Sequence, residues 1–411
     1  MKLRDICEYR NEKIGAEGIT PESYVSTESM LPNRSGIAAA ASIPTSGKVN
    51  LYHQGDTLVS NIRPYFKKIW QASRNGCCSN DILVFQPKDN CNGDYLHWVL
   101  SNETFFDYVT ATAKGTKMPR GDKAAIMQFS VPDFNANQQL KVASLLNPIQ
   151  KKIELNAKLN GYLEKLLLTK YDELFPANAD FTGILSDVGE VIGGATPSKK
   201  RPEYYCSNGI GWITPRDLSN TTDKFIAHGA DDITDVGYAS CSAKILPKGS
   251  VLFSSRAPIG YVAIAADRVA TNQGFKSVVP REEVGTAFIY CFLIRNKQRI
   301  ADRGAGTTFP EISGRMMKSV GLAIPEQASC AEFSSFAKPI FEQQEALEEE
   351  NRKLAALRDA LLPKLMSGEI DVSKVDLTQL NSHLAMLMPP FDMRKRYRIE
   401  KNRLRLWFCA G

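Results

Sequence analysis

Basic side chains stand beside aromatic or hydroxyl side chains in three short stretches of this 411-residue sequence. They are NIRPYFKKIW (61–70), TPSKKRPEYY (196–205) and ITPRDLSN (213–220). Such a mixture places positive charge for phosphate oxygens beside flat rings for base stacking, which is the surface chemistry of a nucleic-acid binder. Solvated strand ends have the same composition, so that plainer interpretation stays open for any single stretch.

Two glycine-threonine loops offer related chemistry. KGTKMP (114–119) and AGTTFP (305–310) share a glycine, a threonine and a proline at the same spacing. The glycine permits close backbone approach and the threonine hydroxyl can donate to a phosphate oxygen, although an ordinary turn has the same features. From these stretches and their repeated counterparts we predict the residues that bind nucleic acid: Ser60, Asn61, Arg63, Tyr65, Lys67, Lys68, Thr116, Lys117, Arg120, Lys199, Lys200, Arg201, Arg216, Ser254, Ser255, Arg256, Thr307 and Thr308.

Catalytic signatures are missing from the sequence. MPPF (388–391) has a methionine where amino-methyltransferases need a hydrogen-bond acceptor, and GAGTTF (304–309) lacks the third glycine of a dinucleotide fingerprint. No GxxxxGK[ST] phosphate loop occurs, and the four histidines are scattered without metal-ligand spacing. We therefore expect no catalytic residue, no metal site and no cofactor in this chain.

The formal net charge of +6 is concentrated near the end of the sequence. Residues 392–411 hold seven Lys or Arg against two acids, which is +5 and leaves about +1 for all the others. If the protein binds nucleic acid through its folded part, local clusters must do so, because bulk charge is almost absent there.

The sequence offers no membrane or export signal. No apolar run reaches the roughly 18 residues that a membrane span requires. The opening MKLRDICEYR has no apolar segment behind its charges, and the nine cysteines form no CxxC pair. We expect a reduced, cytoplasmic protein.

The sequence repeats itself at an offset of about 190 residues. GDTLVSNIRP (55–64) matches GSVLFSSRAP (249–258) 194 residues later, and the two glycine-threonine loops lie 191 residues apart. Solenoid and propeller units repeat at about 20–50 residues. A period this long therefore indicates a duplicated domain with its connector.

Each copy ends in a segment with the 3–4 spacing of a coiled-coil seam, at 148–175 and 339–366. A proline at the start of each suits a first helical turn. The first segment is richer in lysine and the second in acids, which favours pairing with each other, and Asn160 and Asn351 share a seam position that typically fixes register. Packing of each helix on its own domain stays open as an alternative. The predicted pairing residues are Ile149, Ile153, Asn160, Leu163, Leu167, Ile340, Leu347, Asn351, Leu354 and Leu361.

Five longer stretches carry a resemblance to a known family. They are YVSTESMLPNRSGI (24–37), GDTLVSNIRPYFKKIW (55–70), ITPRDL (213–218), GSVLFSSRAPIGYVAIA (249–265) and GTTFPEIS (306–313). With them the sequence resembles the specificity subunit of type I restriction-modification systems, up to about residue 375.

The resemblance implies a non-catalytic reader of double-stranded DNA with a bipartite target. Each target-recognition domain would bind one half-site, and the two helices would lie antiparallel as a spacer. Two methyltransferase subunits would dock there and supply S-adenosylmethionine for N6-adenine methylation. Restriction subunits would supply cleavage driven by ATP with Mg²⁺.

We thus expect an α+β fold of two tandem α/β target-recognition domains, each followed by a long helix, with pseudo-two-fold symmetry. The expected parts are domain 1 at 1–140, helical spacer 1 at 141–178, domain 2 at 179–328, helical spacer 2 at 329–368 and a basic, disordered tail at 369–411. Two other classes stay open. A self-contained restriction-modification enzyme is disfavoured by the missing motifs, and a coiled-coil scaffold would bind no DNA.

Overall fold

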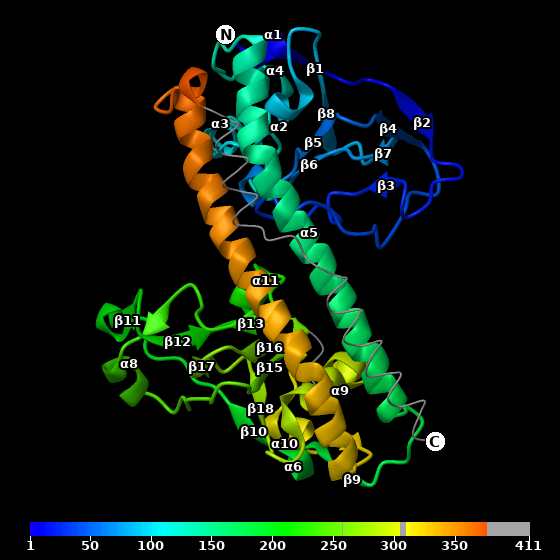
Figure 1. Ribbon diagram of the computed structural model, residues 1–411, viewed down its shortest axis with the longest axis vertical. Coiled ribbons are helices and arrows are strands. Elements are labelled where there is room, and N and C mark those ends of the chain that lie inside the picture. Colours follow the sequence, from blue (N-terminus) through cyan, green and yellow to red (C-terminus); the bar gives the residue numbers. More distant parts are fainter. Residues whose placement is uncertain (257, 305–309, 376–411) are drawn as a thin grey trace, which may run out of the picture. The chain divides into compact units, whose positions relative to one another are not determined.

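The chain folds into two compact units (Figure 1). The computed structural model describes residues 1–256, 258–304 and 310–375. Among the described residues, one unit contains 1–150 together with 357–375, and the other contains those within Lys151–Ala356. Within the described ranges, no helix combines the length and apolar character that a membrane span needs.

Unit 1 contains two four-stranded sheets. The first is antiparallel throughout, and its order is β1 (Cys7–Tyr9), β8 (Ile82–Pro87), β5 (Thr57–Ser60) and β6 (Ile69–Gln71). The second has the order β2 (Lys13–Gly15), β4 (Lys48–Tyr52), β7 (Gly76–Cys78) and β3 (Tyr24–Val25), with β3 parallel to β7. Three helices follow or precede these strands: α1 (Leu3–Ile6), α2 (Gly93–Ser101) and α3 (Glu103–Ala111).

The central strand β5 is buried on both faces, which explains its unbroken apolar character. Successive side chains of a strand point to opposite faces. Leu58 accordingly packs in a cluster with Val84 and Tyr52, whereas Val59 packs in the cluster that contains Leu83 and the helices. The sheet therefore separates two hydrophobic cores.

Unit 2 repeats this plan. Its main sheet has the order β10 (Gly189–Gly193), β18 (Lys276–Pro280), β15 (Val251–Ser255), β16 (Ile259–Ala265) and β13 (Phe225–Ile226). Its second sheet has the order β11 (Tyr205–Cys206), β14 (Asp232–Ile233), β12 (Ile210–Ile213) and β17 (Val269–Thr271). The first four strands of the main sheet match β1-β8-β5-β6 in order and direction. The duplication inferred from sequence is thus a duplication of fold.

The opening glycine of the repeated stretch has the same conformation in both units. Gly55 has φ +92° and Gly249 has φ +85°, in the left-handed region that L side chains rarely adopt. Each glycine lies just before the central strand of its sheet. The shared glycine is therefore required by the turn that leads into that strand.

Shorter elements complete the two units. Helix α9 (Gly285–Ala301) occupies in unit 2 the chain position that α2 and α3 occupy in unit 1. The remaining elements are η1 (Pro64–Phe66), α4 (Lys123–Ile126), β9 (Gly183–Ile184), α6 (Leu185–Val188), η2 (Pro202–Tyr204), α7 (Pro215–Ser219), α8 (Asp235–Ala239), α10 (Gly314–Lys318), β19 (Gly321–Leu322) and η3 (Val372–Lys374).

The two long helices begin earlier than the sequence suggested. Helix α5 spans Ala136–Leu174 and α11 spans Gln327–Ser367, so Pro148 lies inside α5 and not in its first turn. An interior proline costs a helix about 3 kcal/mol. Burial of Val142 and Leu146, which lie six and two residues before the proline, offsets that cost.

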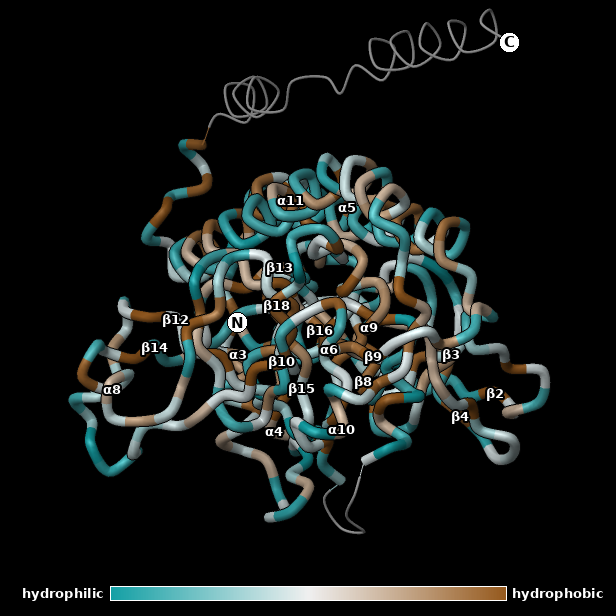
Figure 2. Tube along the Cα trace, turned by 90° about the horizontal axis from the view of Figure 1, so that it is seen from below, coloured by the Kyte–Doolittle hydropathy of each residue, from teal (hydrophilic) through white to brown (hydrophobic). Residues whose placement is uncertain are grey.

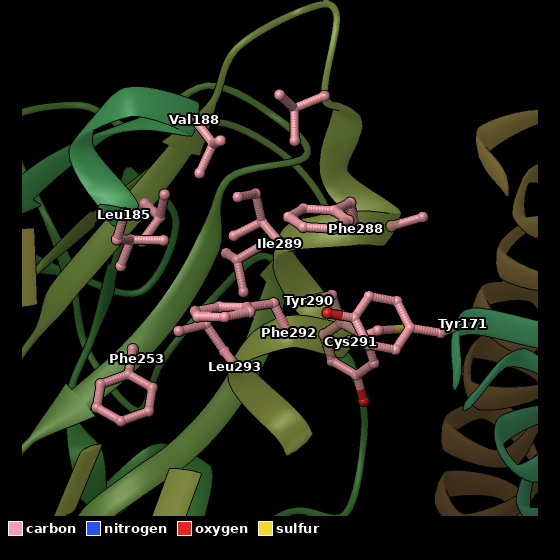
Figure 3. Packing of buried hydrophobic residues seen from close by; sticks show 14 of the residues in the cluster. Tyr171, Leu185, Val188, Phe253, Phe288, Ile289, Tyr290, Cys291, Phe292 and Leu293 are labelled. Carbon is pink, nitrogen blue, oxygen red and sulfur yellow. The ribbon is translucent and has the colours of Figure 1, made fainter. Parts of the chain in front are cut away.

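Each hydrophobic core is closed by segments of both long helices. In unit 1 the cluster includes Val142, Leu145 and Leu146 of α5 and Leu362, Leu365 and Met366 of α11. In unit 2 it includes Leu167 and Tyr171 of α5 and Cys330, Phe333, Ala337 and Ile340 of α11. Figure 3 shows Tyr171 beside Phe288, Tyr290 and Cys291 of α9. Packing of each helix on its own domain alone, the alternative considered above, is therefore wrong.

The helices run antiparallel within each unit. In unit 2, Asn156 Nδ2 donates to Asn351 Oδ1 at 3.0 Å, and Gln344 Nε2 donates to the carbonyl of Asn160 at 3.3 Å. In unit 1, Arg358 donates to Gln150 at 2.8 Å. Hydrophilic and hydrophobic residues alternate along both helices (Figure 2).

The predicted pairing residues are all buried or half-buried, but they do not all face the other helix. Leu167 and Ile340 belong to the core of unit 2, and Leu361 packs against the core of unit 1. The polar partner of Asn351 is Asn156 and not Asn160. Since the helices also cover a sheet domain, seam positions divide between helix and domain contacts.

The unit boundaries differ from the domain limits expected from sequence. They fall inside both helices, at 150/151 and 356/357. Residues 369–375, expected in a tail, pack on unit 1 through Val372, and Lys141 Nζ donates to the carbonyl of Ser373 at 2.8 Å. Residues 376–411 lie outside the described part of the chain.

A buried carboxyl of α11 holds the edge strand of unit 2. Glu348 is 5% exposed and accepts the backbone N–H of Lys224 and Phe225, at 2.9 and 3.0 Å. Burial raises the pKa of Glu348 to about 7, although these two hydrogen bonds oppose the shift.

The free energy of unfolding should therefore fall as pH rises from about 4.5 to about 7, because the folded state holds the Glu348 proton more tightly than the unfolded chain does. Glu348→Gln should remove roughly 1–3 kcal/mol of this pH dependence. Urea unfolding at several pH values measures it, with Glu349→Gln, one residue later and exposed, as the control. Parallel pH profiles for wild type and Glu348→Gln would contradict the assignment.

Candidate nucleic-acid interface

Two predicted loops of unit 1 lie side by side. The Arg63 N–H donates to the carbonyl of Pro119 at 2.8 Å, and Ile62 forms an isolated β-bridge with Arg120. The turn Pro64–Phe66 and the glycine-threonine loop 114–119 therefore form one surface, which we call the unit 1 loop surface.

Only some side chains of the unit 1 loop surface reach solvent. Thr116 and Lys117 are exposed, and Tyr65 is 47% exposed. Arg120 is exposed too, but its guanidinium contacts both carboxylate oxygens of Asp81 at 3.0 and 3.3 Å. These four side chains can meet a ligand without rearrangement of the backbone.

The two lysines of this surface are partly withdrawn from solvent. Lys67 Nζ pairs with Glu103. Lys68 Nζ donates to the carbonyl of Thr27 at 2.7 Å, and burial lowers the pKa of Lys68. Both lysines hold the loop in place as well as adding charge to it.

Four of the predicted contacts are buried side chains. Ser60, Asn61, Ser254 and Ser255 are each less than 10% exposed. Ser254 Oγ donates to the carbonyl of Pro258 at 2.9 Å and accepts the N–H of Tyr261 at 2.8 Å. We therefore remove these four residues from the proposed interface, because they shape the loops from inside.

Unit 2 exposes a different set of cations. Lys199, Lys200, Arg201 and Arg216 are exposed, and Arg201 lies 3.3 Å from Glu203. The first three precede the short helix η2, which begins at Pro202, and Arg216 lies in the first turn of α7, which begins at Pro215. The segments differ from the unit 1 loop surface although the sheets match.

An acidic residue that the sequence did not single out joins two cations in unit 2. Arg256 lies 3.7 Å and Lys276 3.6 Å from the carboxylate of Glu311. Glu311 directly follows the second glycine-threonine loop. In unit 1 the carboxylate that pairs with a loop cation is Asp81, which directly precedes strand β8. The predicted contacts Thr307 and Thr308 lie outside the described residues.

No group of three or more metal-ligating side chains occurs among the residues that the structure describes. The two surfaces thus present charge, hydroxyls and, in unit 1, aromatic rings. Cations that are paired with a carboxylate are available to a phosphate by exchange, because an exposed ion pair contributes less than about 1 kcal/mol. Charge, hydroxyls and rings of this kind are suited to contact with a nucleic acid.

Comparison with known proteins agrees with this chemistry. Residues 182–353 match the family model of the type I restriction modification DNA specificity domain. Over 404 aligned residues the chain is 25% identical to the HindI type I restriction enzyme specificity subunit of Haemophilus influenzae, covering 77% of this chain and 87% of that protein. Residues 182–353 thus match the type I restriction modification DNA specificity domain, and over most of its length the chain is similar to a type I restriction enzyme specificity subunit.

Two further similarities extend this assignment. A 177-residue stretch is 40% identical to the MjaIX specificity subunit of Methanocaldococcus jannaschii, but it spans only 42% of this chain and 40% of that protein. The crystal structure of a type I specificity subunit from M. genitalium matches with a TM-score of 0.53 at 15% identity, covering 89% of this chain and 95% of that one. That likeness supports the fold of a specificity subunit in both units, although the family model matches only within residues 182–353.

Freeing the cation of an ion pair on the unit 1 loop surface should strengthen DNA binding. In Asp81→Asn, Arg120 loses its carboxylate partner and becomes available to a phosphate. We expect two- to fivefold tighter binding of duplex DNA and a salt dependence steeper by about one unit in log–log slope. Fluorescence anisotropy across a salt series measures both. Asp107→Asn, the same charge change at an exposed position of α3, is the control; equal affinities for the two variants would refute the exchange.

Proposed function

We propose that this chain is the non-catalytic DNA-recognition subunit of a type I restriction-modification complex and that each unit binds one half-site of a bipartite target. The observation that carries the proposal is the duplication: two units share a sheet order, and each exposes cations on loops at its own surface. A protein that repeats its binding domain is suited to a target with two recognition elements, as in dimeric repressors. The exposed loops differ between the units, so the half-sites should differ in sequence.

Catalysis would lie on partner subunits. The chain has no methyl-donor motif and no phosphate loop. In this proposal two methyltransferase subunits bind S-adenosylmethionine and methylate adenine at N6, and restriction subunits bind ATP and Mg²⁺ and cleave DNA. The role of this chain is to bring them to the target.

The long helices suit a spacer. Both run unbroken through the boundary between the units, α5 at 150/151 and α11 at 356/357. An α-helix rises 1.5 Å per residue and resists bending over a few turns. A helical connection of this kind would set the number of base pairs between the half-sites.

Methylation profiling tests the proposal directly. The chain is expressed with the methyltransferase subunits of its own host, and methylated adenines are sequenced. We expect one bipartite motif that disappears when this chain is omitted, and no methylation by the purified chain alone. A motif that persists without the chain, or methylation by the chain alone, would overturn the proposal.

The exposed cations of unit 2 give a charge test. Changing Lys199, Lys200 and Arg201 to alanine should weaken DNA binding and lower the salt slope by about one unit per lost phosphate contact. A matched control changes Lys151, Lys158 and Lys165, exposed lysines of α5, to alanine. Anisotropy titrations compare the two triple variants. The same loss in both would mean that bulk charge and not the unit 2 loops binds DNA.

The spacer role predicts a change in the gap. Seven residues inserted into each helix, after Gln150 and after Ala356, add about two turns and about 10.5 Å while nearly keeping side-chain phase. B-DNA advances about 3.4 Å per base pair, so the methylated motif should keep both half-sites and gain about three base pairs between them. Methylation profiling reads the gap, and an unchanged gap would show that the helices do not set it.

A further inference from the structure

Strained backbone is concentrated at one point of the first recognition unit. Among the described residues, four that are not glycine have positive φ: Asn33 (+55°), Arg34 (+62°), Arg63 (+50°) and Lys67 (+52°). They lie in two loops that bond to each other, since the N–H groups of Asn33 and Arg34 donate to the carbonyls of Phe66 and Lys67, both at 2.9 Å. Such clusters of strained residues are typical of binding and catalytic sites.

The fold itself does not require this strain. A left-handed residue other than glycine costs about 1–2 kcal/mol. In unit 2 the positive φ next to the matched connection between β15 and β16 belongs to a glycine, Gly260, the second residue of β16, with φ +102°. Unit 1 instead has Arg63 and Lys67 on either side of the turn Pro64–Phe66. Since glycine would avoid the strain, we infer that the side chains of Arg63 and Lys67 contribute to binding at this surface.

The strained loops present two aromatic rings to solvent. Tyr65 is 47% and Phe66 40% exposed, and their ring centroids lie 4.8 Å apart. Met118, 45% exposed, belongs to the adjoining loop of the unit 1 loop surface. We call Tyr65 and Phe66 the aromatic tip.

A network of charged side chains holds the two loops that carry the aromatic tip. The side chain of Arg34 is 14% exposed; Nη1 donates to the carbonyl of Ser101 at 2.7 Å, and Nη2 lies 3.5 Å from Asp359 of α11. Glu103 lies 3.7 Å from Arg34 and also pairs with Lys67. This network is anchored in three helices, α2, α3 and α11, and it pre-organises the aromatic tip, so that binding requires no ordering of the loop.

We propose that the aromatic tip is a stacking wedge that opens one base step of the half-site bound by unit 1. This inference rests on the proposed function. Apolar side chains inserted between base pairs unstack and kink DNA, and base–aromatic stacking is tolerant of sequence. The cations beside the tip, Arg63 and the exposed Lys117, suit a phosphate backbone on either side of the opened step.

The wedge has a consequence for specificity. Pyrimidine–purine steps unstack most easily, so the half-site of unit 1 should contain such a step at the wedge position even if no side chain hydrogen-bonds to those bases. Unit 2 has Ile259 and Gly260 at the matched positions, within strand β16. Its half-site should lack an opened step.

The test places 2-aminopurine, whose fluorescence rises on unstacking, at each adenine position of the target found by methylation profiling. With the full chain we expect a rise of at least threefold at one or two adjacent positions of the unit 1 half-site. Changing Tyr65 and Phe66 together to alanine should abolish the rise and weaken binding about tenfold. Swapping the two residues, Tyr65→Phe with Phe66→Tyr, should restore both signals because stacking surface is kept.

A matched control removes Tyr162 and Leu166, which are 55% and 50% exposed on α5, and should leave the rise intact. If the chain binds its target without any rise, or if the alanine variant keeps the wild-type rise and affinity, the wedge is refuted while the recognition function stands. If the alanine variant binds DNA normally but fails to assemble with partner subunits, the tip is a protein contact and the wedge is equally refuted. A chain that binds no target DNA refutes the proposed function itself.

Discussion

Each hydrophobic core of this protein depends on two helical segments that are far apart in sequence. The core of unit 1 contains residues of the beginning of α5 and the end of α11, and that of unit 2 contains residues of the end of α5 and the beginning of α11. Neither sheet can bury its helix-facing side without both segments. A recognition domain of this type is therefore not closed by its own stretch of chain, and the helices cannot shift along each other without exposing apolar surface in both units.

Polar groups fix how the edge of unit 2 meets its helices. Lys224, 7% exposed, pairs through Nζ with Glu164 of α5 and donates to Gln344 of α11 at 2.6 Å, and it lies 4.5 Å from the ring of Tyr290. A buried ion pair contributes little net stability, because desolvation offsets the attraction, but removing one partner strands a charge. The apolar core supplies the favourable free energy of this contact, and the ion pair selects one alignment of strand β13 against the helices. Unit 1 makes the equivalent contact with Arg34 and Asp359.

The duplication conserves the scaffold while the surfaces diverge. Sheet order, the left-handed glycine before the central strand and the helical closure recur in both units. The exposed loops do not, since unit 1 carries strained residues beneath two aromatic rings and unit 2 carries a lysine-rich turn. Loops tolerate such change because they contribute few buried contacts to the core. Two different readers can therefore be built on one repeated frame.

The sequence by itself determined the duplication, the two long helices and the resemblance to a family. Glycine turns, apolar strands and seam spacing are patterns of residue type at short separations, so they can be identified directly in the sequence. It also predicted a binding surface at NIRPYFKKIW, where charge stands beside aromatic residues, and the structure exposes Tyr65 and Phe66 there. Tertiary structure alone decided that Ser60 and Ser254 point inward, that Pro148 lies inside a helix, and that Asn351 meets Asn156. It also revealed Asp81 and Glu311 as partners of the cations, and the strain beneath Tyr65. These features depend on which distant segments pack together. Burial and hydrogen bonding between such segments cannot be identified from the residue pattern of a short stretch of sequence.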